Sequence, residues 1–503
     1  MTTARTLRGT AVPAPTGQPR SLLCFAQISD THITDVSSPA RVEYFAQVPA
    51  GVSLHRWPLF GAFRSNETLA PHTLAAMLIA LAAASSPATG ARPLFHIHTG
   101  DACDGAQRNE LRAFLSLLGG RDITPGGGHP YVGVQGREPH SLWYYHPDDP
   151  SRDHFGAQGA PALPGLLDDA RCPLPAPPAL PWYNLVGNHD LMLGGITRPA
   201  SYADEFATCS FKPLAPPASY TDVVAWFHAL QADDPAVSDL LRAQIAARQD
   251  VLEVAPDPDR AILDYAALRA LHDAVQPVLP ASALADRGCY AFSPAEGVHA
   301  ICLDTAVRSG SHEGALDADQ AVWLEEELAR HSAEYRDAQG RAKHGGGSGE
   351  RILLFSHHPL ASMDSELARH DRARPPLLGP AVAALLHRFP AVVALFNGHT
   401  HQHTVTPHRD PAGYHPGFWE VTTAALLDYP QQGRLVDLVS FDDGSVALDI
   451  TLVDHAGPMD PELDGPRDAR TLAGISRLLG RLDFRFPHPA TAAGHGSVRL
   501  WLP

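Results

Sequence analysis

The sequence predicts an α/β fold, and three features carry this prediction. Apolar segments of strand length alternate with helical patterns along much of the 503-residue chain. Five of these apolar segments stop sharply at side chains of metal-binding types. Two long stretches with many Pro and Gly residues read as insertions between the elements. Functional sites in sheets of alternating strands and helices form at the carboxyl ends of the strands, so these polar side chains are expected to converge.

Each of the five apolar segments predicts a buried strand. They are residues 22–28, 93–99, 182–186, 352–355 and 391–396. A short polar motif follows each of them: Asp30-Thr31-His32, Gly100-Asp101, Gly187-Asn188-His189-Asp190, His357-His358-Pro359 and Gly398-His399-Thr400-His401. The recurrence of one local pattern at five strand ends predicts a single shared site.

The other elements are predicted from periodicity, capping and turn signals. Four helices are expected over 66–84, 106–118, 317–328 and 380–388, with Asn66 and Asp317 as N-caps of the first and third. Residues 290–293 and 298–303 predict a hairpin. Further antiparallel strands are expected over 417–423, 434–441 and 446–453.

The expected domain organisation is one catalytic domain with additions. Residues 1–20 are expected to be flexible. The domain itself is expected over 21–453, with insertions at about 119–180 and 191–285 and helices near 220–250 and 260–275. Residues 454–503 are a polar, Pro-rich C-terminal extension that the sequence does not assign to any element.

Composition bounds the compartment and the partners. The formal net charge of −17 disfavours a general affinity for nucleic acid or for an anionic membrane. The first twenty residues lack the apolar core of a secretory signal, and no apolar stretch reaches membrane-spanning length. The six cysteines contain no CxxC pair, and no structural disulfide is expected. We therefore expect a cytoplasmic protein with no nucleic-acid or membrane partner and leave its oligomeric state open.

The strand-end motifs supply the ligands of a two-metal site. They are two carboxylates, one amide and four imidazoles: Asp30, His32, Asp101, Asn188, His357, His399 and His401. A carboxylate can bridge two ions and a neutral imidazole cannot, so Asp101 is the expected bridge. One ion would take Asp30, His32 and His401, and the other would take Asn188, His357 and His399. Mixed His and Asp ligands suit Mn, Fe, Zn or Co rather than Mg or Ca.

Such a pair of ions suits phosphoester hydrolysis. A hydroxide bridging the ions would attack phosphorus, because coordination lowers the pKa of water to about 7. His189 follows the ligand Asn188 and could donate a proton to the leaving oxygen. Asp104 is the expected partner that orients His189, with Asp190 as the alternative.

These motifs resemble those of the calcineurin-like metallophosphoesterase superfamily over residues 22 to about 453. The residues that carry the resemblance are Asp30-x-His32, Gly100-Asp101-x-x-Asp104, Gly187-Asn188-His189-Asp190, His357 and Gly398-His399-x-His401. The segments around Arg41, Asp104 and Asp428 resemble a long, poorly characterised actinobacterial branch. The resemblance implies a four-layer α/β/β/α sandwich, a dinuclear centre with the ligand division given above, and the pairing of His189 with Asp104.

Two departures narrow the function within that superfamily. Its protein phosphatases place an Arg directly after the Asp104 position, where this chain has Gly105. Its purple acid phosphatases carry a Tyr at the position of Asp104. We expect a small-molecule phosphodiester or nucleotide as substrate, selected by a cap formed from the insertions. A phosphomonoesterase with the same site is the alternative, and a catalytically inactive binding module is the alternative from another class.

Several side chains near the motifs have a second interpretation. His358 could replace its neighbour His357 as a ligand. Arg41, Arg64 or Asn109 could contact a phosphate oxygen or the leaving group, although structural salt bridges are the simpler interpretation of the two arginines. His403 could contact the substrate or support a metal ligand from behind. His96 and His98 alternate on one strand and are expected mainly to pack.

Overall fold

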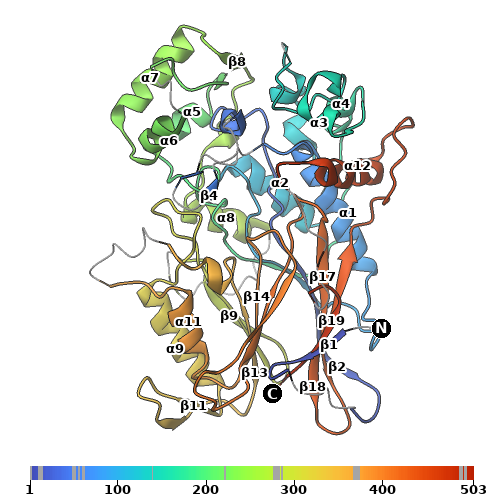
Figure 1. Ribbon diagram of the computed structural model, residues 1–503, viewed down its shortest axis with the longest axis vertical. Helices are drawn as coiled ribbons and strands as arrows, with labels where there is room; N and C mark the ends of the chain where they lie inside the picture. The colour runs from blue at the N-terminus through green and yellow to red at the C-terminus, as the bar shows by residue number, and fades with distance from the viewer. Residues whose placement is uncertain are drawn as a thin grey trace.

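Two large sheets form the centre of the computed structural model (Figure 1). The structure describes residues 3–9, 15–47, 53–54, 57–58, 63–138, 140–219, 223–275, 284, 287–365, 374–486, 491 and 495–502. Parts of the expected flexible N-terminus and of both insertions therefore lie outside the described residues. Within those described, the α/β class predicted from the sequence is confirmed.

The first sheet has seven strands. In spatial order they are β1 (Thr3–Thr6), β19 (Val498–Trp501), β18 (Val446–Asp454), β17 (Gln432–Ser440), β2 (Arg20–Ile28), β5 (His96–His98) and β6 (Trp182–Asn184). The strands β2, β5 and β6 are parallel to one another, and β17 joins β2 in the antiparallel sense. The carboxyl ends of these three parallel strands therefore lie at one edge of the sheet.

The second sheet has six strands. In spatial order they are β15 (Thr404–His408), β16 (Phe418–Thr422), β14 (Val392–Asn397), β13 (Arg351–Phe355), β10 (Val298–Cys302) and β9 (Tyr290–Ala295). The four central strands are parallel, and β9 and β15 are antiparallel edge strands. The predicted hairpin over 290–303 is confirmed as β9 and β10. The segment 417–423, expected to be antiparallel, is parallel to β14 and antiparallel only to β15.

The two sheets pack against each other through large apolar side chains. Phe25 of β2 is fully buried and contacts Phe355 of β13 and Phe396 of β14, with ring centroids 5.7 and 5.4 Å apart. Residues from both sheets belong to one apolar core. This packing holds the ends of β2, β13 and β14 close together.

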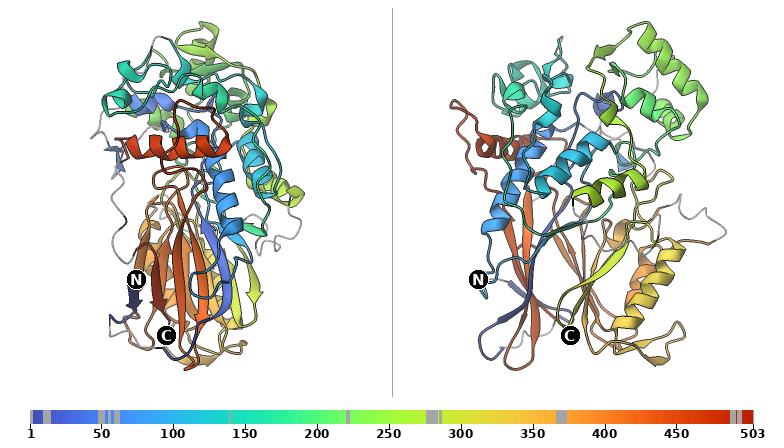
Figure 2. Two further views of the ribbon diagram at one scale, coloured as in Figure 1. Left: turned by 90° about the vertical axis from the view of Figure 1, so that its right-hand side faces the viewer. Right: turned by 180° about the vertical axis from the view of Figure 1, so that it is seen from behind.

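Helices cover the sheets. The helices α9 (Ala318–His331) and α11 (Gly379–Leu386) form a second apolar core with β10, β13 and β14. On the opposite side, α1 (Ala70–Ala83) packs against β17 and β18 and against α12 (Ala469–Leu482) (Figures 1 and 2). The helix α2 (Arg108–Leu118) packs on α1 and on α8 (Tyr265–Val275).

The insertions gather at one end of the sheets (Figure 1). The helices of the insertions at this end are α3 (His154–Ala157), α4 (Leu166–Asp169), α5 (Ala203–Ala207), α6 (Val223–Gln231) and α7 (Pro235–Ala246). Short two-stranded pairs complete the fold: β3 (Ser53–Leu54) with β4 (Trp57–Pro58), β7 (Phe211–Pro213) with β8 (Val251–Glu253), and β11 (Glu334–Arg336) with β12 (Ala342–His344). None of the helices among the described residues combines the length and apolarity needed to cross a membrane.

Two expectations need correction. Thr3–Thr6 form β1, which pairs with β19, so part of the N-terminus expected to be flexible belongs to the sheet. Residues 454–503, which the sequence assigned to no element, contribute α12 and β19. Asn66 does not cap α1, whose N-cap position is Leu69. The Asn66 side chain makes no capping hydrogen bond, and its amide nitrogen donates to the Leu427 carbonyl. By contrast, Asp317 caps α9 as predicted.

The packing of Phe25 predicts a large loss of stability when its ring is removed. The variant Phe25→Ala should lower the free energy of unfolding by about 3–5 kcal/mol, because the buried ring would leave a cavity between the sheets. Chemical denaturation followed by circular dichroism measures this change. The matched control is Leu22→Ala in the same strand, where the side chain is 38% exposed. An equal loss in both variants would contradict a core centred on Phe25.

Candidate metal centre

The chain adopts a left-handed backbone conformation at most of the predicted ligands. The φ angles are 52° at Asp30, 48° at His32, 59° at Asp101, 66° at His399 and 58° at His401. Such a conformation is uncommon outside glycine and costs about 1–3 kcal/mol per residue unless its surroundings hold it. It turns the chain sharply after β2, β5 and β14 and directs several ligands toward one place.

The Asp190 side chain holds the two loops that follow β5 and β6. Its buried carboxylate accepts backbone N–H groups from Gly187 at 2.8 Å, Ala102 at 2.9 Å, Cys103 at 3.0 Å and Asp101 at 3.1 Å. It therefore connects the loop after β5 with the loop after β6. With four backbone donors on its two oxygens, Asp190 has a structural role, and the alternative that it orients His189 is not supported.

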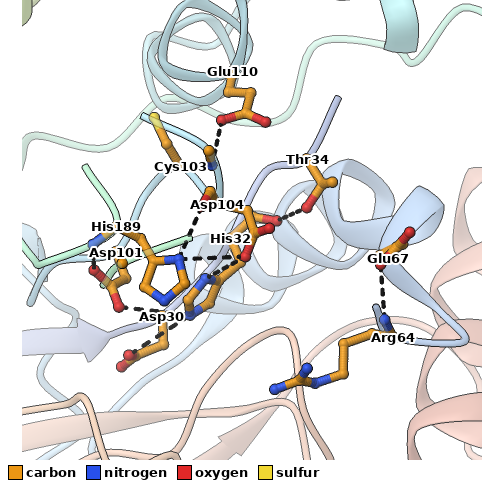
Figure 3. Close-up of polar contacts among 12 residues, drawn as sticks. Asp30, His32, Thr34, Arg64, Glu67, Asp101, Cys103, Asp104, Glu110 and His189 are labelled. Carbon is orange, nitrogen blue, oxygen red and sulfur yellow. Dashed lines mark hydrogen bonds and ion pairs between the residues drawn. The ribbon is translucent and has the colours of Figure 1, made fainter. Parts of the chain in front are cut away.

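Three predicted ligands form a first group. His401 Nε2 lies 3.3 Å from Asp30 Oδ1, and His32 Nε2 lies 3.9 Å from the same oxygen. The two Nε2 atoms of His32 and His401 are 3.3 Å apart. Asp101 Oδ2 lies 3.7 Å from His32 Nε2 (Figure 3). Four side chains from the ends of β2, β5 and β14 thus surround one point.

The remaining predicted ligands form a second group. His357 Nε2 lies 3.2 Å from Asp101 Oδ2 and 3.0 Å from Asn188 Oδ1. The amide nitrogen of Asn188 donates to the Gly195 carbonyl at 2.9 Å, which leaves its oxygen toward His357. The ring of His399 lies 5.1 Å from that of His357. Because Asp101 Oδ2 faces both groups, its position is that of a shared ligand.

Oxygen acceptors fix the orientation of three imidazoles. The Nδ1 atom of His32 lies 3.2 Å from Asp104 Oδ1, that of His357 lies 2.8 Å from the Thr99 carbonyl, and that of His401 lies 2.6 Å from Asp428 Oδ2. A neutral imidazole that donates from Nδ1 presents an unprotonated Nε2. The Nε2 atoms of His32 and His401 face each other and Asp30, and that of His357 faces Asp101, so these atoms need either protons or cations between them. This donor set fits transition-metal ions.

The carboxylates give this site a strongly negative electrostatic potential. Burial alone would lower the pKa of His357, but the Asp101 carboxylate outweighs burial and raises the pKa to about 9. Burial would likewise lower the pKa of His401, but hydrogen bonds with Asp30 and Asp428 raise it to about 10. The site therefore favours positive charge, which bound cations would also supply.

His189 lies beside the first group and packs edge-on against His32, with ring centroids 4.5 Å apart. Its Nδ1 donates to the backbone carbonyl of Asp104 at 2.9 Å, and the Asp104 carboxylate lies 3.5 Å away (Figure 3). The predicted partners are thus adjacent, although the main contact is to the carbonyl. The Asp104 carboxylate itself is held by His32 and by a short ion pair with Arg41.

Other polar residues singled out from the sequence have structural partners. Arg41 pairs with Glu43, Glu67 and Asp104, in accordance with the salt-bridge interpretation. Both ring nitrogens of His358 are engaged, by Thr305 Oγ1 at 2.8 Å and the His312 carbonyl at 3.0 Å, which favours His357 as the ligand.

The remaining candidates also point to packing or to loop geometry. Asn109 donates to Asp35, His98 bonds to Thr31 and Asn184, and His403 accepts the Ala424 N–H. His96 is fully buried. None of these contacts marks the residue as a ligand. All six cysteines are free thiols.

Asp428 and Thr99 are the contacts for which the sequence suggested no role. Asp428 follows the apolar run 424–427, which is the same signal that marked the other strand-end residues. In the sequence, Asp428 stands out only through the family resemblance. The contribution of Thr99 comes from its backbone carbonyl, which no side-chain pattern reveals.

Comparisons with known proteins give little beyond this geometry. No protein-family model matches the chain, and no curated protein matches it. Among solved structures, the crystal structure of a dimetal phosphatase from Danio rerio is similar at a TM-score of 0.38 and 12% sequence identity. The alignment covers 87% of this chain and 97% of that one. A likeness of this degree is too weak to support a function, which must be inferred from the site.

The close approach of the backbone at Gly398 predicts a sensitive position. A Cβ atom there would overlap Ser29 Oγ and Asp30 Oδ2. We expect Gly398→Ala to displace Asp30 and weaken metal affinity by at least about tenfold, the lower end of the range for a lost ligand support. Titration of chelator-stripped protein with Co²⁺ measures this affinity. The control is Gly465→Ala, whose Cβ would meet only the carboxyl group of the exposed, flexible Glu462 side chain; unchanged affinity in Gly398→Ala would contradict the prediction.

Proposed function

We propose that the chain is a dinuclear metal-dependent phosphoester hydrolase of the calcineurin-like metallophosphoesterase type. The observation that carries this proposal is the convergence of three imidazole Nε2 atoms on the Asp30 and Asp101 carboxylates. One ion would be held by Asp30, His32, Asp101 and His401. The other would be held by Asp101, Asn188, His357 and His399. When bound, two such ions activate water and neutralise charge on the phosphoryl oxygens.

His189 would act on the leaving group. Its Nδ1 proton is held by the Asp104 carbonyl, so the ring orientation is fixed and Nε2 is the atom left to exchange a proton. The ring is 20% exposed, which allows contact with a substrate. In this role Nε2 would donate a proton to the leaving oxygen, and Asp104 would keep the ring in place. Asp104 is then a positioning residue for both His189 and His32.

The fold supports the same proposal. We propose that the two packed sheets and the helices that cover them form the four-layer α/β/β/α sandwich expected of this type of enzyme. The insertion 191–285 packs on the loop that follows the first ligands, since Arg260 pairs with Asp35 at 2.7 Å and buried Lys212 pairs with Glu43. We propose that both insertions form a cap that favours small phosphodiesters or nucleotides.

The decisive assay compares two model substrates. Full-length protein reconstituted with Mn²⁺ should hydrolyse bis(p-nitrophenyl) phosphate faster than p-nitrophenyl phosphate, and Asp30→Ala should lose this activity. Faster hydrolysis of p-nitrophenyl phosphate would support the metal centre but would overturn the proposed preference for diesters. Two bound metals with no turnover of either compound, or of a panel of nucleotides and small diesters, would favour a catalytically inactive binding module.

The role of His189 predicts a defect limited to catalysis. The variant His189→Ala should retain its metal ions and lower kcat by about 10²–10⁴, the usual contribution of a positioned proton donor. The loss should be smaller for esters with acidic leaving groups, because these need no proton. A series of aryl phosphate esters of increasing leaving-group pKa measures this dependence. An equal loss across the series would instead assign His189 to phosphate binding.

A further inference from the structure

A series of side-chain contacts connects the metal centre to residues outside it. The Asp428 carboxylate accepts the His401 Nδ1–H at 2.6 Å with one oxygen and Arg64 Nε at 2.8 Å with the other. Asp428 and Arg64 side chains are only 5% and 13% exposed. The guanidinium therefore fixes the carboxylate that fixes the orientation of His401. A carboxylate held on both oxygens cannot rotate away from the imidazole.

The C-terminal segment 483–486 holds Arg64 in turn. The guanidinium carbon of Arg64 lies 3.3 Å from the centre of the Phe486 ring. Arg485 donates to the Phe63 carbonyl at 2.9 Å and pairs with Asp483 at 2.8 Å. A planar guanidinium can stack on a ring and donate to a carboxylate in its own plane at the same time. Phe486 thus restricts the plane in which Arg64 meets Asp428.

The helix α12 anchors the same stretch of chain. Ser65 donates to the Leu479 carbonyl at 3.3 Å. Asn66 donates to Ser476 Oγ at 3.2 Å and to the Leu427 carbonyl at 2.8 Å. Residues 63–66 are therefore fastened between the loop carrying Asp428 and the C-terminal helix. The expected extension 454–503 reaches the metal centre through this stretch.

Among the residues that the structure describes, no contact links the second ligand group to the segment 483–486. His357 is oriented by the Thr99 carbonyl at the end of β5, and Asn188 by the Gly195 carbonyl. Both anchors are backbone atoms of loops beside the parallel strands. Disturbing Arg64 or Phe486 should therefore affect one of the two positions and leave the other.

We propose that Arg64 is a positioning residue for the metal position formed by Asp30, His32 and His401, and that Phe486 keeps Arg64 in place. The C-terminal segment thereby sets the occupancy of one metal position. This inference rests on the proposed dinuclear centre. It assigns to residues 483–486 a role in metal retention that is separate from any contact with substrate.

The test measures metal binding by the full-length chain. Protein stripped with a chelator is titrated with Co²⁺, followed by visible absorption and by calorimetry. The unmodified chain should bind two ions. Arg64→Gln should weaken one of them by up to about tenfold, the lower end of the range for a partner directly behind a ligand, because Arg64 acts through Asp428, and leave the other unchanged. Arg64→Lys should weaken the same ion less than Arg64→Gln does, because an ammonium group keeps the charge but not the planar stack.

Two variants in the C-terminal segment separate metal retention from general packing. Phe486→Ala should weaken the same ion as Arg64→Gln, by a smaller factor. Phe484→Ala is the matched control, because Phe484 contacts His154 and Phe155 and is 42% exposed. It should bind both ions normally. Melting temperatures of the metal-free variants show whether folding is intact, and Phe486→Ala remains informative if Arg64→Gln does not fold.

The outcomes distinguish this inference from the proposed function. If the unmodified chain binds no ions, the proposed function fails. If it binds two ions and both Arg64→Gln and Phe486→Ala do so with equal affinity, only the inference about Arg64 is overturned. Equal weakening of both ions, or the same weakening in Phe484→Ala, would likewise overturn it.

Discussion

The arrangement of the candidate centre depends on the oxygen atoms behind its imidazoles. A carboxylate or carbonyl accepts the Nδ1–H of His32, His357 and His401, so each ring turns its Nε2 toward the same space. These nitrogens and the two carboxylates repel one another unless protons or metal cations lie among them. The fold therefore holds together a cluster that is unfavourable by itself, and metal binding and folding should be coupled.

The two sheets supply the rigidity that this coupling needs. Buried Gln27 in β2 donates to the Asn397 carbonyl at the end of β14 at 2.9 Å and accepts from Thr423 at 2.8 Å. Asp30 comes three residues after Gln27, and His399 two residues after Asn397. A single amide thus fixes the register between the two sheets directly beneath the ligands. Both Asp30 and His399 lie in left-handed turns, and the His399 backbone N–H donates to Asp30 Oδ2 at 3.0 Å.

The sequence predicted what local patterns encode. Apolar runs followed by Asp or His marked the five strands, and the structure brings their polar residues together. The longer-range partners were not predictable in this way. Asp428 pairs with Arg64, 364 positions away, and neither residue has a local signal for that contact. Asn66 has the residue type of a helix cap, but tertiary contacts with Leu427 and Ser476 use its amide instead. The strand Thr3–Thr6 is short and polar, and only its pairing with β19 makes it a strand.

The position of β2 also bears on how the chain folds as it leaves the ribosome. Its principal antiparallel neighbour is β17, in which Arg434 pairs with Gln27 about 400 residues later. At synthesis rates of about 5–20 residues per second, the first strand waits roughly 20–80 s for this partner. During that time its apolar face has no complete sheet to cover it. Chaperone dependence and expression temperature should therefore affect the yield of this protein strongly, even though the finished core is well packed.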